Sequence, residues 1–111
     1  MNLDYEQWGY GPPHPGEVLR EQILPRITLS KGELARHLGI SRNTLDDLLG
    51  ARSPVTLDMA TRLGKAFGNG PRYWLALQMQ HDVWSSEREG GPEIAPIALR
   101  AGMEARAAAA R

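Results

Sequence analysis

The sequence predicts an all-α fold of five helices, and three observations support this prediction. Apolar residues recur at intervals of three and four over most of residues 14–89, as they do along one face of a helix. Capping residues precede three of these runs and glycines follow them, namely Ser30 and Gly39, Ser41 and Gly50, and Thr56 and Gly68. Two of the runs are joined only by Gly39-Ile40-Ser41, which is the length of a helix-turn-helix joint.

The first helix is expected to begin at His14 and to end between Pro25 and Ile27. Pro15 suits its first turn, because the backbone N–H that proline lacks has no partner there. The apolar face of this helix is supplied by Val18, Leu19, Ile23 and Leu24.

Residues 29–52 predict the two helices of the helix-turn-helix. Ser30 and Glu33 form a capping box that starts the first of them. Gly39 stands where a left-handed residue must end that helix, and Ile40 fills the turn. Ser41 then caps the second helix, which is expected to end at Gly50. The facing apolar residues are Leu34, Ala35 and Leu38 on the first helix and Leu45, Leu48 and Leu49 on the second.

The first turn of the second helix carries no apolar side chain and suits the reading of DNA. Its residues are Ser41, Arg42, Asn43 and Thr44. Arginine pairs with guanine, asparagine pairs with adenine, and hydroxyl groups serve either a base or a phosphate. Lys31, at the start of the preceding helix, and Arg52, beyond the second helix, are expected on the DNA backbone. The alternative is that these are the ordinary polar residues of an exposed helix start.

Two further helices are expected after Pro54. Thr56 caps the fourth helix, which runs to Gly68. Pro71 starts a longer fifth helix that is apolar on more than one side. We therefore expect part of it to form a two-fold dimer interface through Tyr73, Trp74, Leu77 and Trp84. The alternative is a thick core within a single chain.

The two ends of the chain are expected to lie outside this helical domain of residues 14–89. Residues 1–13 have little periodicity and several glycines and prolines, which predicts a flexible arm. Its aromatic residues Tyr5, Trp8 and Tyr10 are expected either to anchor a protein partner or to fold back over the domain. Residues 90–111 predict an extended or partly disordered tail, with Ile94, Ile97 and Leu99 lying on the last helix.

The composition argues against several kinds of protein. The 13 basic and 13 acidic residues cancel, unlike those of a protein that coats nucleic acid by bulk charge. The lack of cysteine removes disulfides and thiolate sites. The chain begins without a basic and apolar leader and has no run long enough to cross a bilayer. We therefore expect a cytoplasmic protein without a membrane partner.

The reactive residues do not form a pattern typical of an enzyme. The three histidines, His14, His37 and His81, lack metal-ligand spacing and are expected to be surface or capping groups. No glycine-rich phosphate loop precedes a helix, and Ser85 and Ser86 lack the glycines of a nucleophile elbow. We therefore expect no catalysis, metal, cofactor or small-molecule substrate.

Several short motifs occur in order over residues 14–87. They are His14-Pro-Gly-Glu-Val-Leu19, Leu34-Ala35, Gly39-Ile-Ser-Arg-Asn-Thr-Leu45, Arg52, Met59-Ala60 with Arg62-Leu63, Ala66-Phe67-Gly68, and Trp74-Leu75 with Leu77-Gln78, Asp82 and Trp84. This set resembles the HigA/VapI-type antitoxins. The resemblance implies a lambda-repressor-like fold, a homodimer, and binding to a palindromic operator that controls the protein's own operon. It also implies neutralisation of a HigB toxin, which is a RelE-like, ribosome-dependent mRNA endonuclease.

The resemblance places the DNA contacts on Ser41 to Thr44, with Lys31 and Arg52 on the DNA backbone. Asp46 and Asp47 depart from the family pattern, which often has neutral or basic residues at these positions. Carboxylates near phosphates weaken binding unless one pairs with Arg42 or accepts a hydrogen bond from a cytosine amine. Two other functions stay open: a stand-alone phage-type repressor without a toxin, and a helical adaptor that has lost DNA binding.

Overall fold

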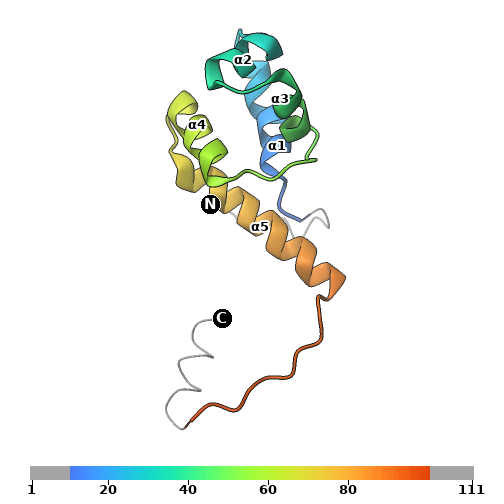
Figure 1. Ribbon diagram of the computed structural model, residues 1–111. Coiled ribbons are helices and arrows are strands. Elements are labelled where there is room, and N and C mark those ends of the chain that lie inside the picture. Colours follow the sequence, from blue (N-terminus) through green and yellow to red (C-terminus); the bar gives the residue numbers. More distant parts are fainter. Residues whose placement is uncertain (1–10, 101–111) are drawn as a thin grey trace.

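The computed structural model describes residues 11–100, and the regular secondary structure within that range is entirely helical (Figure 1). In chain order the segments are α1 (Pro15–Val18), η2 (Leu19–Ile23), η3 (Leu24–Arg26), α2 (Lys31–Leu38), α3 (Arg42–Leu49), α4 (Leu57–Phe67) and α5 (Pro71–Glu89). The predicted all-α class with five α-helices is confirmed. Among the helices described, none combines the length and the apolar character that crossing a membrane requires.

The predicted first helix consists of α1, the π-helical η2 and the 3-10 segment η3. It begins at His14, whose ring Nδ1 accepts a hydrogen bond from the backbone N–H of Gly16 at 2.9 Å. It ends at Arg26, because Ile27 takes an extended conformation. The helix therefore spans the expected residues, with a histidine in the N-cap position that Ser or Asp usually fills.

The core lies between the first helix, the helix-turn-helix and the α4–α5 pair. Six large side chains within it are almost completely buried, namely Leu19, Leu34, Leu45, Leu48, Leu63 and Trp74. Removing each such side chain from water stabilises the fold by about 1.5–3 kcal/mol. All six apolar positions predicted to face one another in the helix-turn-helix are buried. Figure 1 shows α1, α2 and α3 clustered together, with α5 running past the open end of the cluster.

A buried amide joins the chain after α3 to α5. Gln78 Oε1 accepts a hydrogen bond from the backbone N–H of Val55 at 2.7 Å. Gln78 Nε2 donates to Asp82 Oδ1 at 2.9 Å. Because both ends of the amide are bonded, its orientation is fixed, and it holds the chain at Val55 against α5.

Residues 91–100 leave the helices as an extended segment (Figure 1). Gly90 ends α5 in a left-handed conformation with a φ of 85°. Ile94 and Ile97 are 80% and 84% exposed, so the expectation that they lie on the last helix is wrong. The physical reason is that the last turns of α5, residues 85–89, carry only Ser, Glu and Arg and offer no apolar surface.

Candidate nucleic-acid interface

The first helix of the motif, α2, begins and ends as predicted. Ser30 Oγ accepts from the backbone N–H of Glu33 at 3.1 Å, and Glu33 Oε1 accepts from the N–H of Ser30 at 3.0 Å. Hydrogen bonding from the backbone and then the side chain of Ser30 lowers the pKa of the Glu33 carboxyl. Gly39 ends the helix with a φ of 74°. Lys31 is exposed at the first position of α2, beside the positive end of the helix dipole.

The second helix, α3, presents a polar N-terminus and buries its opposite face. Ser41 Oγ accepts from the backbone N–H of Thr44 at 3.0 Å and lies 2.8 Å from the Thr44 hydroxyl. The side chains of Ser41, Arg42, Asn43 and Thr44 are all exposed. The two hydroxyls are engaged in the cap, so Arg42 and Asn43 are the side chains of this turn with the longest reach from the surface.

Both of the acidic residues that depart from the family pattern pair with arginines predicted to contact DNA. Arg42 Nε donates to Asp46 Oδ1 at 3.2 Å, one turn along α3. Arg52 Nε donates to Asp47 Oδ1, also at 3.2 Å. The carboxylates are thus partly neutralised within the chain, as pairing with Arg42 would require.

Two arginines satisfy carbonyl groups at the C-terminal end of α3. Arg52 Nη2 donates to the carbonyl of Asp46 at 3.1 Å. Arg20, from η2, donates through Nη1 to the carbonyl of Leu49 at 2.7 Å. Both positive charges lie at the negative end of the helix dipole, which stabilises α3. The helix ends at Gly50 as predicted, but the left-handed residue is Ala51, with a φ of 58°.

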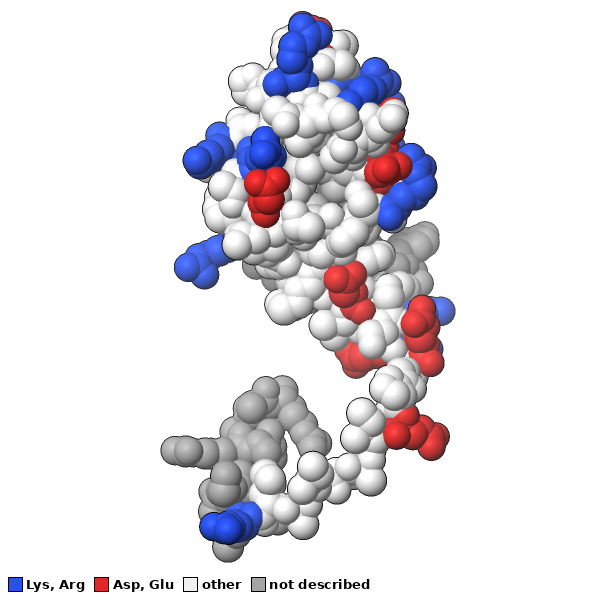
Figure 2. All heavy atoms as spheres, in the orientation of Figure 1, with Lys and Arg blue, Asp and Glu red and all other residues white. Residues whose placement is uncertain are grey.

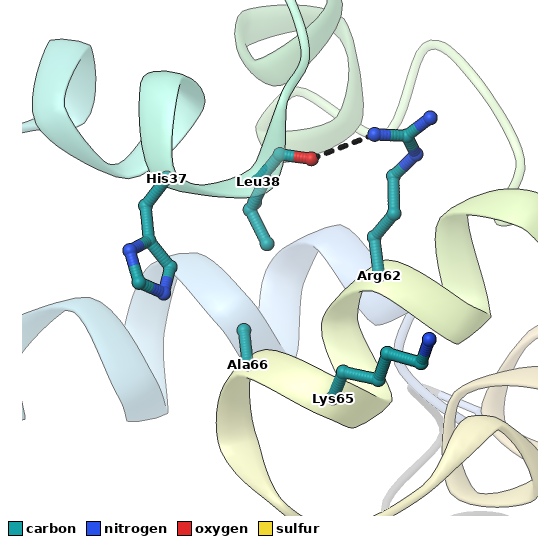
Figure 3. Close-up of a pocket in the computed structure, with 5 residues that line it drawn as sticks. All are labelled: His37, Leu38, Arg62, Lys65 and Ala66. Atoms are coloured by element: carbon teal, nitrogen blue, oxygen red, sulfur yellow. Dashed lines mark hydrogen bonds between the residues drawn. The ribbon is translucent and has the colours of Figure 1, made fainter.

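Arg62 on α4 supports the turn between α2 and α3 (Figure 3). Its Nη1 donates to the carbonyl of Leu38 at 2.9 Å and to the carbonyl of Gly39 at 3.3 Å. Its Nε pairs with Asp58 Oδ2 at 2.9 Å, which holds the guanidinium over the turn. These carbonyls belong to the end of α2 and have no partner within that helix. Figure 3 shows that His37, Lys65 and Ala66 line the same hollow between α2 and α4.

Gly16 allows the first helix to approach α3 closely. A Cβ atom at this position would overlap the carbonyl group of Leu48. The absence of a side chain therefore sets the distance between α1 and the end of α3. Nothing in the local sequence pattern points to this contact, because Gly16 and Leu48 are far apart in the chain.

The charges on the surface are distributed unevenly although the chain has no net charge. Figure 2 shows most of the visible Lys and Arg side chains over the end of the molecule formed by α2, α3 and α4. Several Asp and Glu side chains lie instead along α5 and the segment after it. The motif therefore lies in the more basic part of the described chain.

Two of the residues expected in a dimer interface belong to the core of the chain itself. Trp74 is fully buried and Leu77 is 2% exposed, so neither is available to a partner. Trp74 Nε1 donates to Asn69 Oδ1 at 2.8 Å, and the Tyr73 ring stacks edge-on against it at 5.2 Å. The sequence pattern was misleading because α5 contacts both α4 and α1, and so buries more than one stripe. The large apolar side chains that α5 exposes are Met79 and Val83.

Trp84 is partly covered by the segment that precedes α1. Gly11 lies directly against its ring, where a Cβ atom would overlap the indole. The guanidinium of Arg88 lies 4.7 Å from the centre of the same ring. His81 Nδ1 donates to the carbonyl of Pro12 at 3.0 Å. Residues 11 and 12 therefore fold back over α5, whereas Tyr5, Trp8 and Tyr10 lie outside the described residues.

His14 and His81 form a structural pair rather than a ligand set. Their rings meet edge to face with centroids 5.3 Å apart. Burial, and then the nearby His81, lower the pKa of His14. The prediction that His14 is a capping group is confirmed. Over residues 11–100, no cluster of three or more potential ligand side chains is arranged to hold a metal ion.

Comparison with known proteins identifies the family. No protein-family model matches the sequence. The chain is 38% identical over 76 residues to an uncharacterized HTH-type transcriptional regulator of Haemophilus influenzae, across 68% of this chain and 71% of that protein. It is 32% identical over 75 residues to antitoxin HigA-1 of Vibrio cholerae, across 68% of this chain and 70% of the antitoxin. The chain belongs to the HigA family of helix-turn-helix antitoxins.

A solved structure of the HigA family agrees with this assignment. Pseudomonas aeruginosa antitoxin HigA, determined with the higBA promoter, is 32% identical, with a TM-score of 0.67 over 78% of this chain and 99% of that one. The resemblance noted in the sequence is thereby confirmed. The HigA-type relatives named here are regulators or antitoxins, and none of them is named as an enzyme.

Proposed function

We propose that the protein is an antitoxin that represses its own operon by binding palindromic operator DNA as a homodimer, and that it neutralises a HigB-like, mRNA-cleaving toxin. The observation that carries the proposal is the exposed Arg42-Asn43 end of α3, presented by a helix-turn-helix whose HigA relative was determined with promoter DNA. The operator lies in the cytoplasm, so the protein acts there.

In the proposed complex the N-terminal end of α3 enters the major groove. Arg42 reads a guanine, Asn43 reads an adenine, and the Ser41 and Thr44 hydroxyls contact the backbone or a base edge. Lys31 and Arg52 contact phosphates on either side of α3. Each such phosphate contact releases a counterion, so affinity falls as the salt concentration rises.

The proposed dimer forms through the part of α5 that remains exposed. Met79 and Val83 lie four residues apart and therefore share one face of the helix. Tyr73 and Trp84 are partly exposed and remain members of the proposed interface, whereas Trp74 and Leu77 are not. A two-fold arrangement on this face would present two copies of α3 to the two halves of a palindrome.

DNA binding is tested by fluorescence anisotropy with a duplex that carries the palindrome upstream of the gene. Arg42→Ala is expected to weaken binding by about 1–3 kcal/mol, because it removes a base contact. The matched control is Arg72→Ala, which removes an exposed positive charge from the start of α5 instead. Equal losses in the two variants would contradict the assignment of α3 as the reading helix.

Toxin neutralisation is tested with the product of the adjacent small open reading frame. The two proteins are expected to co-purify, and the antitoxin should stop ribosome-dependent mRNA cleavage by its partner. Deletion of residues 1–10 should weaken this capture if Tyr5, Trp8 and Tyr10 are anchors, because it removes all three. Undiminished capture by the truncated chain would exclude the arm as the contact site.

A stand-alone repressor is the second candidate function. The Haemophilus influenzae relative favours it, since that protein is named as a transcriptional regulator and not as an antitoxin. This candidate predicts the same DNA binding without any complex with the neighbouring gene product. Operator binding together with failure to co-purify would select it.

A further inference from the structure

We propose that Asp46 is a positioning residue that orients Arg42 for the recognition of guanine. The inference rests on the proposed operator binding and adds a determinant of base specificity to it. The two residues lie one turn apart on α3, and Arg42 Nε donates to Asp46 Oδ1 at 3.2 Å.

The edge of the guanidinium that carries this bond decides what Arg42 presents to DNA. The bond uses Nε, which lies at the inner end of the group. Within residues 11–100, this is the hydrogen bond that the Arg42 side chain makes. The two terminal nitrogens, Nη1 and Nη2, are therefore directed away from the carboxylate. Those nitrogens form the pair of donors that matches O6 and N7 of guanine.

The carboxylate is itself held in place. Asp46 lies in the middle of α3, and its side chain is 41% exposed, less than the 54% of its partner. Its backbone carbonyl accepts from Arg52 Nη2 at 3.1 Å, which fixes this turn of the helix. An arginine restrained on such a support loses less conformational freedom when it binds a base than a free arginine does.

Two effects of Asp46 on DNA binding have opposite signs. Its negative charge opposes the approach of phosphates and weakens binding to every sequence. Its bond to Arg42 favours the geometry for guanine and strengthens binding to the correct sequence only. Neutralising Asp46 should therefore increase affinity for unrelated DNA and decrease discrimination at one base pair.

Asp47 provides a matched control on the adjacent residue. It pairs with Arg52 at the same distance of 3.2 Å, but at the C-terminal end of α3. Asp46→Asn and Asp47→Asn change the charge of α3 by the same amount. A general electrostatic effect would appear in both variants, whereas the positioning of Arg42 would be lost in Asp46→Asn alone. Exposed pairs of this kind contribute little to stability, so both variants should fold.

The experiment measures binding of the full chain to the upstream palindrome and to duplexes in which each guanine of a half-site is replaced in turn by adenine. The position read by Arg42 is the one at which Arg42→Ala no longer distinguishes the two duplexes. There the unmodified chain should prefer guanine by about tenfold or more. Asp46→Asn should reduce that preference to about threefold or less, Asp47→Asn should keep it, and both should bind an unrelated duplex more tightly.

The possible failures are distinguishable. If the unmodified chain binds no duplex, both the proposed function and this inference are overturned. If the palindrome is bound but Arg42→Ala keeps full discrimination at every guanine, or Asp46→Asn keeps it at the Arg42 position, only the role of Asp46 is overturned. A change confined to a cytosine position in Asp46→Asn would assign its carboxylate to direct base contact and would also overturn the positioning role.

Discussion

The guanidinium of Arg62 donates to the carbonyl of Leu38 at 2.9 Å, and so α4 holds the end of α2 at the turn of the helix-turn-helix. The bond crosses 24 residues of sequence. It joins a helix outside the motif to the point at which the motif changes direction. The relative orientation of α2 and α3 therefore depends on α4 as well as on their own contacts.

Arg62→Ala should lower the free energy of unfolding by about 1–2 kcal/mol, because the carbonyls of Leu38 and Gly39 lose a charged donor. It should also weaken operator binding, since the turn is less firmly held. Urea denaturation and anisotropy measure the two effects. Lys65→Ala, on the rim of the same hollow, is the control and should change neither. Identical behaviour of the two variants would argue against a supporting role for Arg62.

Gly16→Ala should destabilise the protein by about 1–3 kcal/mol, because the added methyl group must push α1 away from the Leu48 carbonyl. Gly32→Ala is a control of opposite sign. It lies in α2, and a Cβ atom there would come no nearer than 4.0 Å to another residue's side chain. That change should stabilise the fold by about 0.4–1 kcal/mol. Thermal or urea denaturation of both variants tests the contrast, and a neutral Gly16→Ala would refute the close contact.

Stability should decrease as the pH falls below 6.5, the ordinary pKa of histidine. Burial and His81 lower the pKa of His14 in the folded protein, so the unfolded chain binds a proton at a higher pH. The stabilising contribution of neutral His14 is therefore complete above pH 6.5 and is lost on acidification. Protonation also removes the acceptor for the Gly16 N–H.

Urea denaturation at about pH 7.5 and about pH 5.5 measures this dependence, and the range stays above the titration of Glu33. His14→Asn is the informative variant, because asparagine is a good N-cap residue that does not titrate. It should show a smaller loss of stability over the same range. An equal loss in the variant would assign the pH dependence to other groups.

Val83→Glu should convert the proposed dimer to monomer, because it places a charge on the exposed apolar face of α5. Leu57→Glu introduces the same change on an exposed site of α4 and should leave the dimer intact. Sedimentation or light scattering distinguishes the two species. Trp74→Ala should instead lower the free energy of unfolding by about 3–5 kcal/mol, since its ring is in the core. A dimer that persists in Val83→Glu would require another interface.

Features determined by neighbouring residues could be predicted from the sequence. The capping box of Ser30 and Glu33 and the left-handed Gly39 each depend on contacts within one or two turns, and both occur as predicted. The exposed polar start of α3 follows from the same local pattern, which is why the candidate reading residues could be chosen in advance. Their role as DNA contacts stays a prediction.

Features that depend on distant segments could not be predicted in this way. Arg20 reaches the end of α3 across 29 residues, and an arginine on a first helix gives no sign of such a partner. Trp74 resembled a surface residue because a stripe wider than one interface fits two explanations, a partner chain or two neighbouring helices. Only the arrangement of α5 between α4 and α1 distinguishes them.

The amide of Gln78 gives α5 mechanical access to the far end of the reading helix. A force that shifts α5 along its axis must carry the backbone at Val55 with it, or break the two hydrogen bonds that the amide makes. Breaking them would strand polar atoms in a dry interior, which is the costlier course. Displacement of one helix is thereby transmitted as a pull on the other.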